Sequence, residues 1–285
     1  MSNTPPARGQ DVPGLVDLHA HTTASDGVLA PARLVDLAIA RGLVVLAVTD
    51  HDTTDGVERA LAAAAGSGLR VIPGVELSTD VPAGEVHILG YFLEPRSPVL
   101  VDALRRFREA RHGRAQRMVE QLIAAGLPIS FEAVAAIAGE GTIGRPHVAR
   151  ALVAAGCAAS VDDAFARYLV RGRPGYVERF KLTPADAVRL IRDASGVPVL
   201  AHPLSAVGLD ALLPELIAAG LGGLEVYYGD YDEAARAQLL ALARRHDLAP
   251  TGGTDYHGPN IAHSRDLGDA GVPLECVAAL EARRQ

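Results

Sequence analysis

The chain has 285 residues, 49% of them hydrophobic, and its formal net charge is −7 at pH 7. This length suffices for one large α/β domain with a sizeable core, and the acidic balance provides no general basic field for binding nucleic acid. No apolar run approaches the roughly 18 residues of a membrane helix, so we expect no membrane contact. The opening MSNTPPARGQDVPG lacks the features of a signal peptide, so we expect a flexible leader over residues 1–13 and a cytoplasmic protein. The acidic balance leads us to expect no stable complex with DNA.

Short apolar runs alternate with helical patterns after this leader. The run GLVDLHAH ends a first strand, and Pro31 and Gly42 bracket a helix. The continuous apolar run LVVLAVTDHD is typical of a buried parallel strand. A second helix (55–68) and two more strands (69–78 and 86–93) follow. This order predicts a parallel sheet or barrel, whose first part covers residues 14–97.

The pattern then changes to helices alone before the alternation resumes. From residue 98 the helical patterns continue without a strand, and we expect a helical insertion, or cap, over residues 98–180. Strands within VPVLAHP, GLEVYYG and LAPTGGTDYHG then alternate with helices. Residues 181–285 are therefore expected to form the second part of the barrel.

Histidines and acidic residues gather at the ends of the expected strands. In parallel α/β architectures the loops at the carboxyl ends of the strands converge, so these side chains should meet at one place. The residues in question are His19, His21, Asp50, His51, Asp52, Glu76, His87, His202, Asp255 and His257.

This distribution indicates a metal site. A single histidine at a strand end is more often a core or loop residue, and a single aspartate there is often a helix cap. Six of the ten histidines, however, fall within strands or at their ends. Imidazoles and carboxylates without thiolates suit first-row divalent ions. The spacing of His19 and His21 also puts both side chains on one face of an extended strand.

The ordered motifs DLHAHTTASDG, AVTDHDT, GVELST, VHILGYF, LAHP and GGTDYHG resemble those of the PHP family, named for its polymerase-associated and histidinol-phosphatase members. The resemblance spans residues 15–267. It implies a distorted (β/α)7 barrel, here with an inserted helical subdomain, and a site with two to three divalent ions.

The resemblance also implies which residues hold the metals. The ligand sets carried over by position are His19, His21, Glu76 and Asp255 for a first ion, Asp26, His51 and His257 for a second, and Glu76, His87 and His202 for a third. The residues of the first two sets are also the expected catalytic residues. Manganese is the expected metal, with zinc or iron as alternatives, because imidazole and carboxylate accept all three.

Phosphoester hydrolysis is the chemistry that such a site favours. Three divalent ions would bring six positive charges against the carboxylates of Asp26, Glu76 and Asp255, so the site should prefer an anion. Metals can lower the pKa of a bound water to roughly 7, which supplies a metal-bound hydroxide for in-line displacement. Asp50 and Asp52 flank a ligand, and either orient it or bond to the backbone of their turn.

The segment GTIGRPHVARAL in the helical insertion is the candidate for substrate specificity. Arg145 precedes Pro146, so the guanidinium and the free N–H groups of a first helical turn could bind a phosphate together, with His147 beside them. A surface arginine with a stacking histidine is the alternative. This segment resembles the PHP subgroup that hydrolyses nucleoside 3',5'-bisphosphates and short 5'-phosphorylated RNA.

We therefore expect a metal-dependent phosphoesterase that acts on a phosphorylated nucleotide or short RNA. Histidinol phosphate phosphatase is an enzyme alternative that the helical insertion disfavours. A polymerase-type accessory domain is disfavoured because no polymerase region accompanies the motifs. A metal-dependent amidohydrolase is the third alternative, because barrel metal sites also activate water against amides. The sequence does not indicate an oligomeric state.

Overall fold

The computed structural model describes residues 15–81, 84–139, 141, 143–178, 182–259 and 265–284. The expected leader (1–13) and the expected boundary between residues 180 and 181 lie outside these ranges. Within them, seven strands form one sheet in chain order. These strands are β1 (Leu15–Asp17), β2 (Leu43–Val48), β3 (Arg70–Val81), β4 (Gly84–Tyr91), β5 (Val197–Leu200), β6 (Gly223–Tyr228) and β7 (Ala249–Gly253).

The first and last strands meet, so the sheet is a nearly closed barrel. The Leu18 amide donates to the Gly252 carbonyl at 3.1 Å, just beyond the end of β1. The carboxylate of Asp17 is fully buried and accepts hydrogen bonds from the Thr254 hydroxyl at 2.6 Å and from the Gly268 amide at 2.9 Å. The expected (β/α)7 barrel is confirmed.

The distortion of the barrel lies at β4. This strand pairs antiparallel with both β3 and β5, whereas the remaining neighbours pair parallel. The parallel pairing that the strand and helix order predicts is therefore wrong at this strand, because no crossover helix separates it from β3. One consequence concerns His87. It lies in the first half of β4, which the reversal brings to the end of the barrel where the other strands finish.

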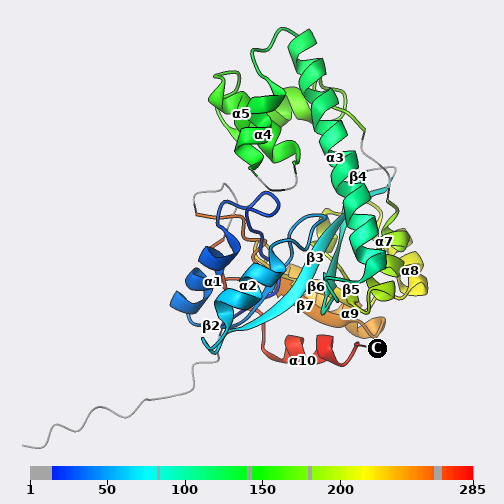
Figure 1. Ribbon diagram of the computed structural model, residues 1–285. Coiled ribbons are helices and arrows are strands. Elements are labelled where there is room, and N and C mark those ends of the chain that lie inside the picture. The colour runs from blue at the N-terminus through cyan, green and yellow to red at the C-terminus, as the bar shows by residue number, and fades with distance from the viewer. Residues whose placement is uncertain are drawn as a thin grey trace, which may run out of the picture.

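Helices cover the barrel, and a helical lobe rises from one end of it (Figure 1). The helices around the barrel are α1 (Pro31–Ala40), α2 (Val57–Ala64), α7 (Pro184–Asp193), α8 (Leu209–Ala219), α9 (Glu233–Arg245) and α10 (Glu275–Glu281). The helices of the lobe are α3 (Pro98–Ala124), α4 (Phe131–Ala138), α5 (Arg145–Ala154), α6 (Val161–Ala164) and the π-helical turn η1 (Phe165–Leu169). No helix in the described part of the chain is long and apolar enough to span a membrane.

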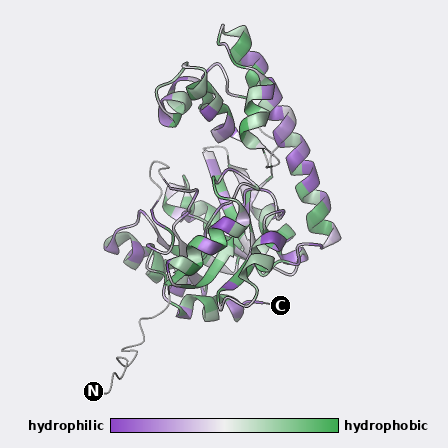
Figure 2. Ribbon diagram, turned by 60° about the vertical axis from the view of Figure 1, so that its left-hand side comes forward, coloured by the Kyte–Doolittle hydropathy of each residue, from purple (hydrophilic) through white to green (hydrophobic). Residues whose placement is uncertain are grey.

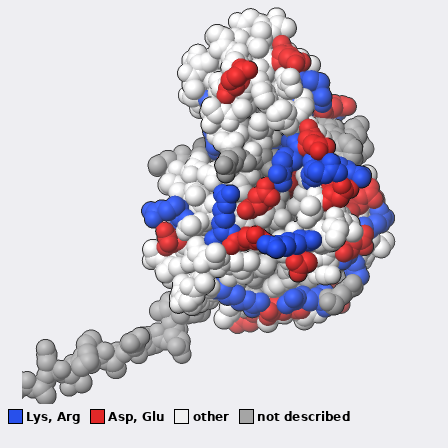
Figure 3. Space-filling model, in the orientation of Figure 1, with Lys and Arg blue, Asp and Glu red and all other residues white. Residues whose placement is uncertain are grey.

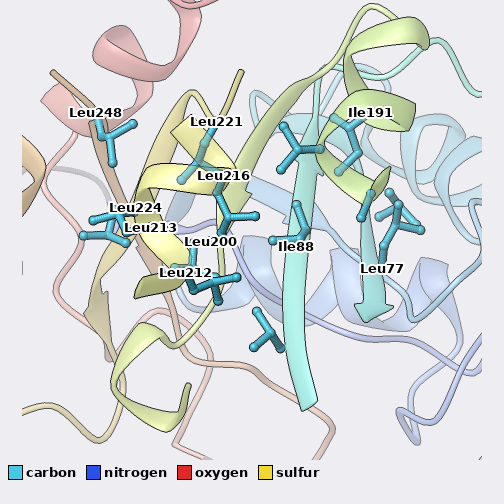
Figure 4. Packing of buried hydrophobic residues seen from close by; sticks show 14 of the residues in the cluster. Leu77, Ile88, Ile191, Leu200, Leu212, Leu213, Leu216, Leu221, Leu224 and Leu248 are labelled. Carbon is cyan, nitrogen blue, oxygen red and sulfur yellow. The ribbon is translucent and has the colours of Figure 1, made fainter. Parts of the chain in front are cut away.

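The barrel interior is apolar at the end that α10 covers. It is polar at the opposite end, called the upper end, which faces the helical lobe. Val45, Ile72, Leu89 and Val199 belong to one buried cluster that α10 joins through Leu280. Hydrophobic residues dominate the strands, while most helices carry both kinds of residue (Figure 2). A second cluster lies between the strands and α7 to α9, and Figure 4 shows its leucines and isoleucines interdigitating. This packing fixes the strands that carry the polar residues at the upper end.

The helical lobe has a core of its own, and α3 connects it to the barrel. Leu100 and Leu104, near the start of α3, belong to the outer cluster of the barrel. Met118 and Leu122, near its end, pack instead with residues of α4 and α5, such as Leu152. The insertion that we expect to begin at residue 98 is thus held by one continuous helix that both cores share.

Gly253 provides a test of barrel closure. A Cβ atom there would stand 2.5 Å from His19 Cβ and 2.7 Å from the Asp17 carboxylate, so Gly253→Ala must displace β1 from β7. We expect a loss of about 1 to 3 kcal/mol in the free energy of unfolding, measured by denaturant titration. Gly113→Ala is the matched control, because the nearest atom to its added Cβ is 3.6 Å away in the middle of α3. It should stabilise the protein by about 0.5 to 1 kcal/mol. Equal stability of the two variants would contradict this account of the closure.

Candidate metal centre

In each strand every second side chain points into the barrel. At the upper end these inward positions are occupied by polar residues instead of apolar ones. His51 extends the inward series of Val45 and Ala47 beyond β2, and Glu76 extends that of Ile72 within β3. On the reversed strand β4, His87 precedes the inward Leu89. The strand ends therefore deliver imidazoles and carboxylates to the same small volume above the apolar interior.

Glu76 lies at the centre of this volume and is 1% exposed. Its Oε2 is 3.2 Å from His19 Nε2, 3.2 Å from His21 Nε2 and 3.1 Å from His51 Nδ1. Its Oε1 is 2.8 Å from His87 Nδ1 and 3.3 Å from His202 Nε2. One carboxylate thus contacts five imidazoles contributed by four strand ends.

The predicted ligands fall into three overlapping groups whose donor atoms lie within 4.8 Å of one another. The groups are His19, His21, Glu76 and Asp255; His21, Asp26, His51 and His257; and His51, Glu76 and His87. The first matches the ligand set that the family resemblance implies. The second adds His21 to that set, and the third contains His51 where the resemblance implies His202. All nine predicted metal ligands are nevertheless neighbours within this end of the barrel.

Several donor atoms in these groups are buried and have no hydrogen-bond partner. They are His19 Nε2, His21 Nδ1, His21 Nε2, His51 Nδ1, Glu76 Oε2 and Asp255 Oδ1. Lone pairs that face one another at about 3 Å repel unless a proton or a cation lies between them. Buried polar atoms left unsatisfied are costly. Five of the six meet around Glu76 Oε2 and Asp255 Oδ1 at contacts of 3.0 to 3.3 Å, while His21 Nδ1 lies 3.9 Å from Asp26 Oδ1. The donor set therefore fits divalent metal ions.

The electrostatics of the cluster keep its carboxylates ionised. Burial acts to raise the pKa of Glu76, but the nearby His51, His19 and His87 hold it well below its usual range. Burial, together with His21 and His87, lowers the pKa of His51 to about 4 in spite of Glu76 and Asp26. Ionised carboxylates and the neutral His51 can coordinate metals directly. In spite of burial, Glu76 and its neighbouring carboxylates raise the pKa of His21 to about 10 and that of His87 to about 9, so a metal must displace a proton from these two rings.

Asp50 and Asp52 hold chain segments that carry predicted ligands. Asp50 accepts hydrogen bonds from the Thr22 amide and the Ser25 hydroxyl, both at 2.7 Å, and so holds the loop that bears Asp26. Asp52 accepts from the Ser78 amide at 2.9 Å. These partners lie outside the turn that carries Asp50 and Asp52, because the Thr22 and Ser78 amides are 28 and 26 residues away in the chain.

Three residues of the site have a left-handed backbone. The φ angles are +52° at Asp52, +26° at His202 and +53° at Asp255. Residues other than glycine adopt this region at a cost, and such strain is concentrated at functional sites. Each of the three lies in the turn that follows a strand. The turn directs the side chains of His202 and Asp255 into the cluster, and at Asp52 it directs that of the preceding His51.

The lobe contributes arginines to the margin of the site. Arg145 begins α5, and its Nη2 lies 2.7 Å from both carboxylate oxygens of Glu85. Glu85 Oε2 is in turn 3.9 Å from His87 Nε2, so Arg145 is one residue removed from the metal cluster. His147 is only 2% exposed, and its Nδ1 accepts from the Gly144 amide at 3.0 Å. The structure therefore places Arg145 at the site and His147 behind it, as a cap of α5.

Sequence reasoning missed three supporting residues. Glu225 bonds the ring of His19 at 2.9 Å, and the Tyr228 hydroxyl donates to Asp255 at 3.0 Å. Arg111, on α3, donates to Asp52 and to the Ser78 hydroxyl. Glu225 could have been noticed as the one charged residue of the apolar run GLEVYYG. Arg111 gives no such signal, because it is one of many arginines along α3.

Comparison with known proteins agrees with this geometry. The PHP domain model matches residues 17–130. The 5'-3' exoribonuclease Rnm of Escherichia coli is 39% identical over 251 residues, which are 86% of this chain and 86% of that protein. The 3',5'-nucleoside bisphosphate phosphatase of Chromobacterium violaceum is 37% identical over 262 residues, 88% of this chain and 92% of that one. A solved structure from Bifidobacterium adolescentis, described as a metal-dependent phosphoesterase, has a TM-score of 0.86 at 34% identity and covers 99% of this chain and 98% of its own.

Replacement of Asp255 tests the metal centre. Asp255→Asn keeps the size of the side chain, and asparagine tolerates the left-handed backbone, but the variant loses a charged ligand. We expect it to bind at least one divalent ion fewer per chain by elemental analysis, while the metal-free protein still folds because the barrel core is apolar. Asp247→Asn is the matched control, since Asp247 has a φ of +52° and lies at the surface against Arg283. A full metal complement in Asp255→Asn would remove Asp255 from the ligand set.

Proposed function

This chain belongs to the PHP domain family, and we propose that it hydrolyses 3',5'-bisphosphonucleotides and short 5'-phosphorylated RNA as a metal-dependent phosphoesterase. The single observation that carries the proposal is the set of buried, unpartnered donor atoms around Glu76. An array of this kind at the open end of a barrel accommodates several cations and then an anionic substrate. Phosphoric ester hydrolysis is the activity shared by the names of the relatives.

The residues present suit two to three divalent ions. We propose manganese, with zinc or iron as alternatives, because the groups combine imidazoles and carboxylates and include no thiolate. When bound, such ions activate water and neutralise the charge of a phosphoryl group. The chain's own contribution is to hold the ligands. Asp50 fixes the loop of Asp26, while Tyr228 binds one oxygen of Asp255 and leaves the other directed at the cluster.

The charge balance of the site favours an anion. Within the three ligand groups the carboxylates are those of Asp26, Glu76 and Asp255, so three divalent ions would leave an excess of positive charge. The face of the surface drawn in Figure 3 adds no such excess. In Figure 3, basic and acidic side chains lie next to one another where the lobe meets the barrel. We infer that the attraction for phosphate is local to the metals and the arginines beside them.

Arg145 is the proposed ligand of a second phosphate. Its ion pair with Glu85 is partly exposed on both sides, at 23% and 30%, so solvent screening keeps that pair weak. A phosphate group can therefore replace Glu85 as the partner of the guanidinium. His147 keeps the turn before α5 in place through Gly144, which makes it a support of this phosphate site.

A phosphate-release panel tests the proposal. The metal-loaded protein is assayed with a mononucleotide, a 3',5'-bisphosphonucleotide, a 5'-phosphorylated oligoribonucleotide and histidinol phosphate. We expect the bisphosphonucleotide and the oligoribonucleotide to be hydrolysed with the highest kcat/KM, and activity to disappear after chelation. Rapid turnover of histidinol phosphate without turnover of the bisphosphonucleotide would reverse the assignment.

Arg145→Ala tests whether the lobe binds the second phosphate while the barrel hydrolyses the first. A charge-assisted contact to phosphate is worth roughly 1.5 to 3 kcal/mol, which corresponds to about a ten- to hundredfold loss in kcat/KM for a bisphosphonucleotide. Hydrolysis of an aryl phosphate, which carries no second phosphate, should remain near normal, and so should the metal content. Equal losses on both substrates would place Arg145 at the reacting phosphate instead.

The control for this variant is Arg105→Ala. Arg105 lies on the exposed surface of α3 and pairs with Asp102 and Glu109, away from the cluster. The Arg105→Ala variant should hydrolyse both substrates with normal kcat/KM. This result would separate a specific effect of Arg145 from a general effect of removing positive charge from the lobe.

A further inference from the structure

Glu225 is a buried carboxylate that bonds to two predicted metal ligands. It lies in β6, is fully buried, and points into the barrel beside the cluster. Its Oε1 is 2.9 Å from His19 Nδ1, and its Oε2 accepts from the backbone amide of His202 at 2.6 Å. Both short contacts are to N–H donors, and neither partner is an arginine or a lysine.

The bond to His19 determines which ring nitrogen faces the metals. An ionised carboxylate can only accept a hydrogen bond, so Nδ1 of His19 keeps its hydrogen and donates it, and the lone pair that can bind a metal is on Nε2. That nitrogen is unpartnered and lies 3.2 Å from Glu76 Oε2 and 3.3 Å from Asp255 Oδ1. Glu225 thereby orients a ligand of the first group.

The bond to His202 acts on the opposite side of Glu76. His202 has a φ of +26°, a conformation that an isolated residue would leave. Its amide is held by Glu225, and its ring nitrogen Nε2 then lies 3.3 Å from Glu76 Oε1, next to His87. The same carboxylate thus positions a residue at each of the two oxygens of Glu76.

We propose that Glu225 is a positioning residue that couples two metal positions, the one at His19 and the one at His202. The inference rests on the proposed function only in requiring that the cluster binds divalent ions. Burying a carboxylate without a fixed cation is unfavourable, and an ion bound to His19 supplies the missing positive charge through the imidazole. An ion at either position therefore stabilises the Glu225 geometry that the other position requires.

Glu225→Gln is the direct test. The glutamine amide has one acceptor oxygen, so it can accept from His19 or from His202, while its NH₂ group faces the other donor. Loss of such a supporting carboxylate weakens metal binding by about 10- to 100-fold. Calorimetric titration of Mn²⁺ into chelator-stripped protein should show two weakened positions. The thermal unfolding of the stripped protein is measured alongside, because a merely structural carboxylate would change stability and leave Mn²⁺ affinity unchanged.

Asp50→Asn is the matched control, since it also converts a buried carboxylate into an amide near the cluster. Among the described residues, the Asp50 carboxylate bonds to the loop of Asp26, through Thr22 and Ser25, and the backbone bond from the Glu76 amide to the Asp50 carbonyl survives the substitution, so the replacement should weaken one position. In a His202→Ala background, which keeps the backbone amide but removes the ring, Glu225→Gln should weaken only the His19 position. Two weakened positions in that background, or wild-type Mn²⁺ binding by Glu225→Gln, would overturn the proposal.

The wild-type protein offers an independent measurement if Glu225→Gln does not fold. In ¹⁵N spectra recorded during titration with diamagnetic Zn²⁺, the His19 ring should carry its proton on Nδ1. The His19 Nδ1–H and His202 amide signals should shift together. A proton on Nε2, or shifts at separate zinc equivalents, would contradict the coupling. Absence of any zinc binding by the wild type would instead contradict the proposed function itself.

Discussion

The structure depends on a single buried carboxylate that five imidazoles surround. Glu76 shares Oε2 with His19, His21 and His51 and Oε1 with His87 and His202, at 2.8 to 3.3 Å. Such crowding of donor atoms is tolerable with protons or cations between them, on a scaffold stiff enough to resist their repulsion. The apolar interior of the barrel supplies that stiffness. The inward-pointing residues that precede the ligands on the same strands, such as Ala47 and Ile72, are buried in a close-packed core. The site is therefore the direct continuation of the core.

The reversed direction of strand β4 allows imidazoles to contact both carboxylate oxygens of Glu76. A parallel fourth strand would place its first residues, including His87, at the far end of the barrel. Because β4 runs antiparallel between β3 and β5, Ser78 lies opposite His87, and this histidine meets Glu76 from the side that parallel strands leave uncovered. The distortion of the barrel is thus connected with the composition of the metal centre rather than incidental to it.

The sequence predicts the ligands better than it predicts what holds them. His19 and His21 share one face of an extended segment, and strand ends converge in any α/β barrel, so the cluster follows from local pattern and fold class. The direction of β4 does not follow, because alternation looks the same in either direction. Glu225 and Arg111 act through partners far away in the chain, at separations of 206 and 59 residues, which no local pattern encodes. His147 has a role that its position beside Arg145 does not suggest, because it is buried and its ring accepts a hydrogen bond from the Gly144 amide at the start of α5.

The junction between lobe and barrel bears on the proposal that an acidic protein selects an anionic substrate. Arginines of the lobe pair with acidic residues of the barrel around the cluster, Arg145 with Glu85, Arg111 with Asp52 and Arg108 with Asp55. These pairs hold the lobe over the site while cancelling its positive charge, so they attract no anion from a distance. Of these three pairs, the Arg145 pair is partly exposed at both partners and has a carboxylate that itself contacts a predicted ligand, since Glu85 approaches His87. Exchange of that one carboxylate for a phosphate would retain the docked lobe. Selectivity would then arise because the second phosphate must reach Arg145 while the first lies at the metals, a condition set by the spacing between barrel and lobe.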